Sequence, residues 1–159
     1  MTPAVDAAKA ARIEFKIHQY EHDHGAAYGL EAAEKLGVDP QRVFKTLMLE
    51  TDLGSRVLAV AVIPVAATLD LKAAARALKQ KRVAMAEPQV AQRLTGYLLG
   101  GISPLGQKRG FATVIDASAE KLESIYVSAG RRGLELELSP ACLATLTQAH
   151  FAAIAKFKF

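Results

Sequence analysis

Residues 95–108 read TGYLLGGISPLGQK, and this stretch limits the possible fold more than any other part of the chain. Four of its fourteen positions are glycine and one is proline, so neither a helix nor a central strand is expected to run through it. We therefore predict a shaped loop. Gly100 and Gly101 can offer backbone N–H groups to a ligand oxygen, and Ser103 adds a hydroxyl. A plain connector between a helix and a strand fits the same composition, so both interpretations stay open.

Apolar side chains recur with strand periodicity in the first half of the chain. Residues 14–20 alternate as a half-buried strand does, with Tyr20 facing away from Phe15. Residues 42–50 and 56–65 are rich in β-forming side chains and are separated by the turn-forming sequence TDLGS. This arrangement predicts an antiparallel hairpin in the middle of a sheet.

The remaining patterns alternate between the two kinds of regular structure. Helices are expected at residues 2–12, 26–36, 71–79, 88–94 and 141–148, and further strands at 82–86, 111–116, 124–128 and 134–138. The order of these elements predicts an α+β fold around one largely antiparallel sheet, ending in a helix.

Length and composition suit one folded unit. A chain of 159 residues with 51% apolar side chains can bury a sizeable core, so we expect one domain over residues 1–159. Lys and Arg exceed Asp and Glu by 20 to 16, and the net charge of +4 suits a polyanionic partner without requiring one. One cysteine, no signal-like start and no apolar run of membrane-span length predict a soluble, cytoplasmic protein with no membrane partner.

Lys45 is unusual within the predicted strand at residues 42–50. In strand period it shares a face with Val43, Leu47 and Leu49, and an ammonium among apolar side chains is costly unless it reaches water or an anion. Such a lysine can extend from a strand end or protect a sheet edge. It can equally be a cation that faces a ligand.

Two common catalytic motifs are absent. Gly101 and Gly106 have the glycine spacing of a phosphate-binding loop, but Gln107 stands where that motif needs lysine. Ser128, in YVSAG, lacks the first glycine of a nucleophile elbow. The sequence therefore gives no support to a nucleotide-binding loop or to a serine nucleophile.

Metal and thiol chemistry are equally weakly supported. His22 and His24 could contact one metal ion, but no third ligand is marked and a polar turn is an ordinary place for histidine. Cys142 lies in the apolar context PACLATL, which is typical of a small buried thiol. An enzyme built on this chain is expected to position its substrate with backbone donors and a cation.

Four segments together resemble the YbaK/EbsC family. They are MTPAV at the start, VFKT around Lys45, the loop at residues 95–108, and IYVSAGRRGLELEL. The similarity covers essentially the whole chain. The family is related to the editing domain inserted in bacterial prolyl-tRNA synthetases, and its members hydrolyse the ester between a wrong amino acid and tRNA(Pro). The resemblance implies a mixed, mostly antiparallel and strongly curved sheet surrounded by helices.

The resemblance also implies a cleft whose key cation is Lys45. Together with the loop argument, it makes Lys45, Gly100 and Gly101 the expected catalytic residues. The expected substrate-binding residues are Tyr20, Tyr28, Thr46, Ser103, Ser128 and Glu135. The position of Glu135 is aspartate in the related member, so the carboxylate here is one methylene longer and its reach can differ.

Members closest to this pattern remove cysteine from tRNA(Pro), and the resemblance implies the same partner here, with prolyl-tRNA synthetase in a ternary complex. No metal or other cofactor is implied, because the thiol of the substrate attacks its own ester and leaves as a thiolactone. The basic residues expected to contact the tRNA backbone are Lys79, Lys81, Arg82, Lys108, Arg109, Arg131 and Arg132.

Three alternatives remain at the level of sequence. One is a binding module for tRNA or synthetase without turnover, and another is a deacylase for a different mischarged aminoacyl-tRNA. The third is a metal-dependent hydrolase that uses His22 and His24.

Overall fold

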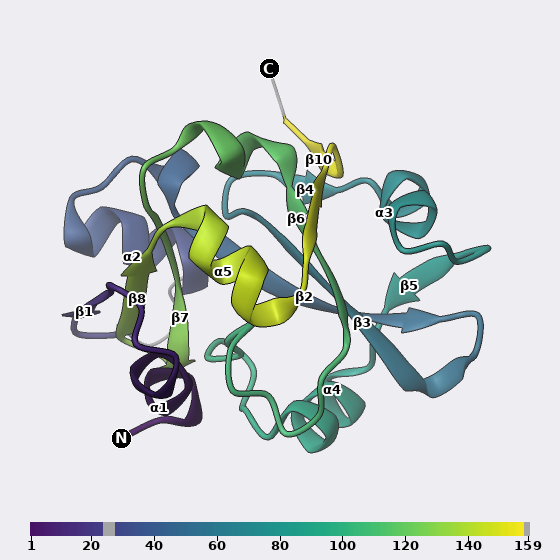
Figure 1. The fold of residues 1–159 in the computed structure, drawn as a ribbon, viewed down its shortest axis with the longest axis horizontal. Coiled ribbons are helices and arrows are strands. Elements are labelled where there is room, and N and C mark those ends of the chain that lie inside the picture. Colours follow the sequence, from purple (N-terminus) through teal and green to yellow (C-terminus); the bar gives the residue numbers. More distant parts are fainter. Residues whose placement is uncertain (24–27, 158–159) are drawn as a thin grey trace.

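The computed structural model describes residues 1–23 and 28–157, and its largest element is a five-stranded sheet. The strands of this sheet are β2 (Phe44–Thr51), β3 (Gly54–Pro64), β5 (Val83–Met85), β6 (Ala112–Asp116) and β9 (His150–Ala152). Their order is β5-β2-β3-β6-β9 (Figure 1). The predicted hairpin is confirmed, because β2 pairs antiparallel with β3 and places Lys45 opposite Ile63.

Two pairings in this sheet are parallel, and neither was predicted. β6 pairs parallel with β3, and β9 pairs parallel with β6. The chain therefore does not end in a helix as expected. A strand as short as β9 shows no clear alternation, and parallel pairing joins segments that are distant in sequence, so periodicity alone does not reveal it.

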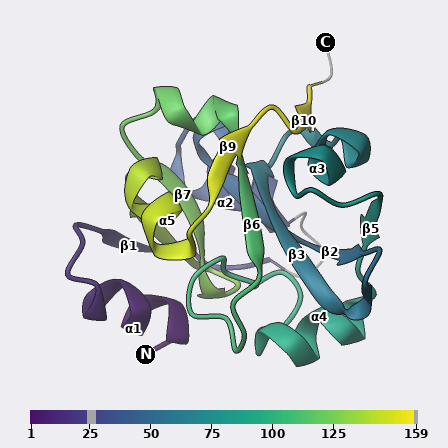
Figure 2. The same cartoon turned by 45° about the vertical axis from the view of Figure 1, so that its right-hand side comes forward.

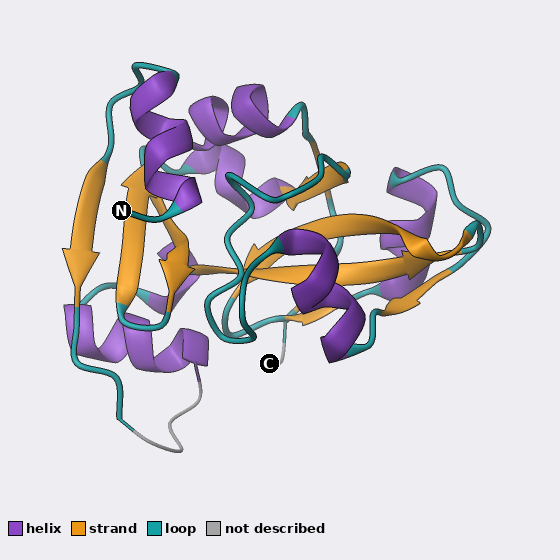
Figure 3. Ribbon diagram, turned by 90° about the horizontal axis from the view of Figure 1, so that it is seen from below, coloured by secondary structure: helices purple, strands orange, loops and turns teal. Residues whose placement is uncertain are grey.

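A second sheet stands beside the first (Figure 3). It has the order β1-β8-β7, with β1 (Lys16–Gln19), β7 (Ile125–Arg131) and β8 (Leu134–Leu138) all antiparallel. Two further short strands, β4 (Thr68–Leu69) and β10 (Ala155–Lys156), pair with each other. One sheet was expected, and the described residues form three. Most strand pairs are antiparallel, which confirms the predicted α+β class.

Within residues 1–23 and 28–157, one isolated bridge joins the two larger sheets. Val43, just before β2, pairs with Tyr126 of β7. The start of β2 therefore meets the second sheet. Lys45 lies two residues beyond this junction, which is where the candidate site is found.

Three of the α-helices begin where the sequence supplies capping side chains. The α-helices of the described residues are α1 (Pro3–Ala10), α2 (Tyr28–Leu36), α3 (Leu71–Ala77), α4 (Pro88–Thr95) and α5 (Pro140–Thr147), with 3-10 turns at Pro40–Arg42 and Ala117–Lys121. Thr2, Asp70 and Ser139 accept hydrogen bonds from first-turn N–H groups of α1, α3 and α5. Gly96 ends α4 with a φ of 85°, a conformation that favours glycine. Within residues 1–23 and 28–157, no helix is long and apolar enough to cross a membrane.

Strand β3 is buried on both faces. Val60 and Val62 belong to the larger core, which also includes residues of α1, α4 and α5. Ala61 and Ile63 point to a smaller core under α3. Figure 2 shows α3 and α5 on opposite sides of β3 and β6. Burial on both faces explains why β3 reads as an almost continuous apolar run.

Candidate functional site

A cavity of about 440 Å³ lies where the start of β2 meets the second sheet. Its walls come from β2, β7, β8, α2, the end of β1 and the glycine loop at residues 95–108. Six of the residues expected at the site line it together: Tyr20, Lys45, Thr46, Gly100, Ser128 and Glu135. The volume is within the usual range for a small-molecule site.

Lys45 brings a cation to this cavity without a protein counter-ion. Its side chain is half-buried, and burial lowers the pKa of its ammonium. Among the described residues it forms no ion pair or hydrogen bond through that ammonium. An unpaired, partly desolvated ammonium binds a ligand oxygen more strongly than a solvated one does.

Glu135 brings a buried carboxyl group to the same cavity. It lies on β8 opposite Ser128 of β7, and only 6% of the residue is exposed. Burial raises the pKa of this carboxyl to about 8, so it carries a proton at neutral pH. Burial also raises the pKa of Tyr20, and the nearby Glu135 adds to that shift. The two side chains therefore form a weakly charged part of the cavity that Lys45 also lines.

Two further polar groups at the cavity wall have no protein partner. The hydroxyl of Thr46 is buried and makes no hydrogen bond within the described chain. Gly100, with a φ of 85°, has a backbone N–H that donates to no acceptor among the described residues. Buried polar groups are nearly always paired, so the unpaired, buried hydroxyl of Thr46 is typical of a site that a ligand completes. Donors from Lys45, Thr46 and Gly100 suit a carbonyl or ester oxygen.

Two expected site residues serve the shape of the loop instead. The N–H of Gly101 donates to the carbonyl of Leu98 at 3.0 Å, and a Cβ on Gly101 would lie 2.6 Å from the Cα of Arg131. Ser103 is fully buried, and its hydroxyl accepts a hydrogen bond from the N–H of Leu105 at 3.2 Å. Neither residue lines the cavity, so the expected direct contact of Gly101 and Ser103 with substrate is not supported by this geometry.

Two other expected site residues, Tyr28 and His24, are not fully described by the structure. Tyr28 is the first residue of α2, but its side chain lies outside the described part of the chain. His24 lies outside it altogether. His22 is described, and its Nδ1 lies 2.5 Å from the carboxylate of Glu31. Within residues 1–23 and 28–157, no group of three or more His, Cys, Asp or Glu side chains could hold a metal ion.

The basic residues expected to contact RNA are exposed and fall in three places. Lys79, Lys81 and Arg82 lie between α3 and β5, Lys108 and Arg109 lie at the end of the glycine loop, and Arg131 and Arg132 lie at the β7–β8 turn. Sequence reasoning missed the apolar wall of the cavity, where Leu30 and Leu99 are partly exposed. The adjacent pair Leu98-Leu99, directly before Gly100 in a glycine-rich loop, was a sequence signal that could have identified Leu99.

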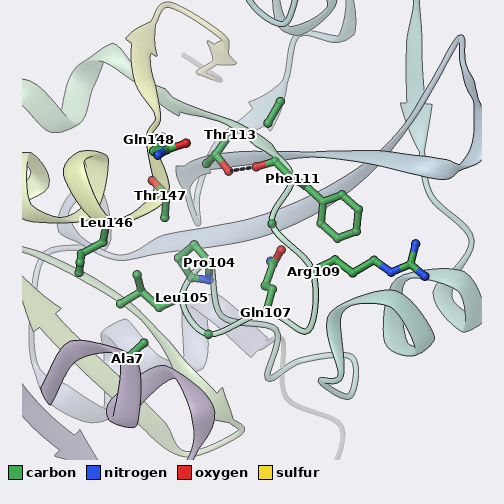
Figure 4. Close-up of a pocket in the computed structure, with 13 residues that line it drawn as sticks. Ala7, Pro104, Leu105, Gln107, Arg109, Phe111, Thr113, Leu146, Thr147 and Gln148 are labelled. Atoms are coloured by element: carbon green, nitrogen blue, oxygen red, sulfur yellow. Dashed lines mark hydrogen bonds between the residues drawn. The ribbon is translucent and has the colours of Figure 1, made fainter. Parts of the chain in front are cut away.

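A separate hollow of about 550 Å³ lies between the glycine loop and α5 (Figure 4). Its walls include Leu105, Gln107, Phe111 and Leu146, but none of the six residues named above as lining the smaller cavity. The hydroxyl of Thr113, which lines this hollow, already donates a hydrogen bond to the carbonyl of Phe111. The smaller cavity around Lys45 is therefore the better candidate for chemistry.

Comparison with known proteins identifies the family of the chain. The family model of the aminoacyl-tRNA editing domain matches residues 23–146, which is most of the chain. The chain belongs to the aminoacyl-tRNA editing domain family. It is 37% identical over 155 residues to an Enterococcus faecalis protein named "Putative Cys-tRNA(Pro)/Cys-tRNA(Cys) deacylase EbsC", covering 96% of this chain and 92% of that one. The resemblance to the YbaK/EbsC family is thus confirmed.

Other relatives are similar to this chain over most of its length. The Bacillus subtilis protein YwhH is 27% identical over 137 residues, covering 83% of this chain and 85% of that one. The crystal structure of hypothetical protein APE2540 superposes with a TM-score of 0.86 at 25% identity, over 97% of this chain and 99% of that chain. A structure described as "a putative trans-editing enzyme for prolyl tRNA synthetase" has a TM-score of 0.84 at 20% identity, over 97% and 95%. These superpositions confirm the editing-domain fold.

Proposed function

We propose that this editing-domain protein removes cysteine from mischarged Cys-tRNA(Pro), through one domain that spans residues 1–159. The observation that carries the proposal is the set of unpaired polar groups around one cavity: the ammonium of Lys45, the hydroxyl of Thr46 and the N–H of Gly100. Donors of this kind, held in place before substrate arrives, stabilise the negative charge that develops on an ester carbonyl during attack.

The cavity does not offer an activated protein nucleophile among its described residues. Ser128 lines it, but the hydroxyl of Ser128 accepts a hydrogen bond from the N–H of Gly130 at 3.1 Å, and no histidine of residues 1–23 and 28–157 lines the same cavity. Cys142 belongs to α5 and does not line the cavity. A substrate that carries its own nucleophile is therefore the substrate that these walls suit best.

Cysteine supplies that nucleophile. In the proposed step, the sulfur of the cysteinyl group bonds to its own carbonyl carbon, and the bond from that carbon to the ribose oxygen breaks. The thiol proton is transferred to the departing ribose hydroxyl, so a thiolactone and free tRNA result. Lys45 and Gly100 hold the carbonyl oxygen, while Ser128, Tyr20 and Glu135 orient the cysteinyl group.

The similarity to EbsC, whose name gives Cys-tRNA(Pro) and Cys-tRNA(Cys), supports cysteine as the amino acid. The fold shared with a structure described as a trans-editing enzyme for prolyl tRNA synthetase is in keeping with action on tRNA(Pro) and with prolyl-tRNA synthetase as a partner. A deacylase for another mischarged aminoacyl-tRNA remains the second candidate, because carbonyl-binding donors do not distinguish amino acids.

Incubation of the pure protein with Cys-tRNA(Pro), with and without a metal chelator, tests the proposal. Deacylation that resists the chelator is expected. No deacylation of any aminoacyl-tRNA would leave only a binding role, and loss of activity in the chelator would favour a metal-dependent hydrolase.

The seryl ester tests the internal nucleophile. Serine is nearly the same size as cysteine, but its hydroxyl is a much weaker nucleophile than a thiol. We expect Ser-tRNA(Pro) to compete for the site and to be cleaved far more slowly. Equal cleavage rates for the two esters would require an activated water in place of substrate-assisted attack.

A further inference from the structure

Four cationic side chains from three distant segments line a second hollow, of about 390 Å³. They are Arg56 near the start of β3, Arg93 in the last turn of α4, and Lys108 and Arg109 at the end of the glycine loop. We call this set the basic hollow. All four side chains are exposed, and the other lining residue is Leu94. Arg56 and Arg93 were not among the basic residues expected from sequence, because they are far apart in the chain and carry no motif.

The cations of the basic hollow have no protein counter-ions. Among residues 1–23 and 28–157, none of the four side chains forms an ion pair or a hydrogen bond. Four like charges around one hollow repel each other and concentrate positive potential there, which attracts a polyanion. Three of the four are arginine, whose planar guanidinium group suits the paired oxygens of a phosphate.

The basic hollow is tied to the glycine loop. The N–H of Lys108 donates to the carbonyl of Thr95 at 2.8 Å, so the two ends of the loop meet beside the hollow. Gly100, near the tip of the same loop, lines the Lys45 cavity. In Figure 4 the side chain of Arg109 extends away from Leu146, and Arg109 lines the basic hollow together with Arg93 of α4.

The β2–β3 hairpin sets the distance between the two sites. Lys45 pairs with Ile63 near one end of β3, and Arg56 lies seven residues away near the other end. At about 3.3 Å per residue, roughly 20 Å of strand separates them. Figure 1 shows this hairpin running from the side of the molecule with α2 to the side with β5 and α4.

We propose that the basic hollow binds the phosphate backbone of the RNA whose aminoacyl end occupies the Lys45 cavity. The proposal rests on the function proposed above and adds a second binding surface to it. At a rise on the order of 3 Å per nucleotide along one strand, roughly six or seven nucleotides span the separation. A free nucleotide or a single phosphate is too short to occupy both places, whereas the end of a tRNA reaches both.

Direct binding measurements on the full-length protein test this surface. The double variant Arg56→Glu/Arg93→Glu is compared with wild type for affinity toward uncharged tRNA(Pro) at several salt concentrations. The control is Lys72→Glu/Lys121→Glu, which makes the same change in net charge at exposed lysines outside the hollow. A milder pair, Arg56→Gln/Arg93→Gln, serves if charge reversal disturbs α4, and circular dichroism checks the fold of each variant.

We expect the Arg56/Arg93 reversal to weaken tRNA binding at least tenfold near 0.1 M salt, and the control to change it less than twofold. The slope of log affinity against log salt should become shallower by about 0.7 to 0.9 for each phosphate that the variant no longer neutralises. Unchanged affinity in the reversal and glutamine variants, or equal weakening by the control, overturns the proposal because net charge alone would then explain binding.

Cysteinyl-adenosine, an ester without any phosphate, separates this proposal from the proposed function. The Arg56/Arg93 variant should cleave it at the wild-type rate while its KM for Cys-tRNA(Pro) rises. A wild-type protein that binds tRNA through the hollow but cleaves neither ester would contradict the proposed chemistry alone. A variant that loses cleavage of cysteinyl-adenosine as well would place Arg56 or Arg93 in the ester site, contrary to the inference.

Discussion

Two glutamates stand two residues apart on β8 and lie in opposite electrostatic situations. Glu137 is held by three side chains: Ser124 donates to it at 2.5 Å, His18 lies at 2.9 Å and Arg42 at 3.3 Å. Glu135 is more deeply buried, and no hydrogen bond to its carboxyl is found in the described chain. One strand thus carries a carboxylate paired with protein side chains and a carboxyl that lines the cavity without a hydrogen-bond partner among the described residues.

The difference appears in the proton affinities of the two groups. Burial raises the pKa of Glu135 to about 8. Burial also acts on Glu137, but hydrogen bonds from Ser124 and His18 outweigh it and hold the pKa of Glu137 below its ordinary value. A buried acid that the fold pairs fully is part of the scaffold. A buried acid left unpaired in a cavity costs stability, and such groups are typical of functional sites.

The largest expected effect comes from the cation that shares the cavity with Glu135. Lys45→Ala should lower kcat/KM for Cys-tRNA(Pro) by about 10²- to 10³-fold, which is the cost of one carbonyl-stabilising donor, about 2.7 to 4 kcal/mol. Stability should not fall, because the ammonium that is removed is half-buried and unpaired. Deacylation kinetics and thermal unfolding of the same preparation measure both.

Lys45→Arg sharpens this test. A planar guanidinium group does not fit the space of a compact ammonium, so we expect activity well below wild type although the charge is kept. Full activity in the alanine variant would remove Lys45 from the mechanism.

Glu135→Gln should change how stability depends on pH. Since the pKa of Glu135 is raised in the folded protein, wild type loses stability as pH rises from the ordinary glutamate value toward about 8. The glutamine side chain does not ionise in this pH range. The free energy of unfolding of the variant, relative to that of wild type, should therefore increase by about 1.4 kcal/mol per pH unit in this window. Urea unfolding at pH 5.5 and pH 7 measures the difference, about 2 kcal/mol. A constant difference between the two pH values would mean that Glu135 is charged in the fold.

Sequence alternation predicted the strand LELEL but could not separate its two glutamates. The partners of Glu137 come from β1, from the 3-10 turn before β2 and from the segment before β7. Only the three-dimensional fold brings Arg42, which is 95 residues away, to this carboxylate. The β2–β3 and β7–β8 hairpins were predictable because each depends on a local turn, whereas the parallel strand β9 depends on distant pairing.

The site was predictable to a similar extent. The glycine loop and Lys45 could be identified because each breaks a local rule of composition. The different roles of Gly100 and Gly101 could not be predicted. They depend on which of the two N–H groups donates to the carbonyl of Leu98 and on the close approach of Arg131. Adjacent glycines look the same in sequence and differ only when the neighbouring strand is in place.

Glu137→Gln should affect stability rather than catalysis. Weakening hydrogen bonds to a partly buried carboxylate should cost about 1 to 3 kcal/mol at pH 7, which lowers Tm by several degrees in a chain of this size. Because the pKa of Glu137 is lowered in the fold, its contribution is present at neutral pH and is lost as pH falls below the ordinary glutamate value. The variant should therefore match wild type in acid. If the variant lost kcat while keeping wild-type stability, Glu137 would instead have a role in catalysis.

The smallest effects are expected at the two side chains that could be mistaken for nucleophiles. Ser128 lies opposite Glu135 in the register, but its hydroxyl already accepts the N–H of Gly130. Ser128→Ala should therefore lower activity only a few-fold, by loosening the cysteinyl group, and Cys142→Ala should leave it unchanged because α5 carries that thiol away from the cavity. Removing a true nucleophile typically costs about 10⁴- to 10⁶-fold in kcat, so the two cases are easily distinguished. Trapping the product identifies the source of the sulfur: thiolactone should precede free cysteine in wild type and in both variants. Its absence from all three would assign the attack to water.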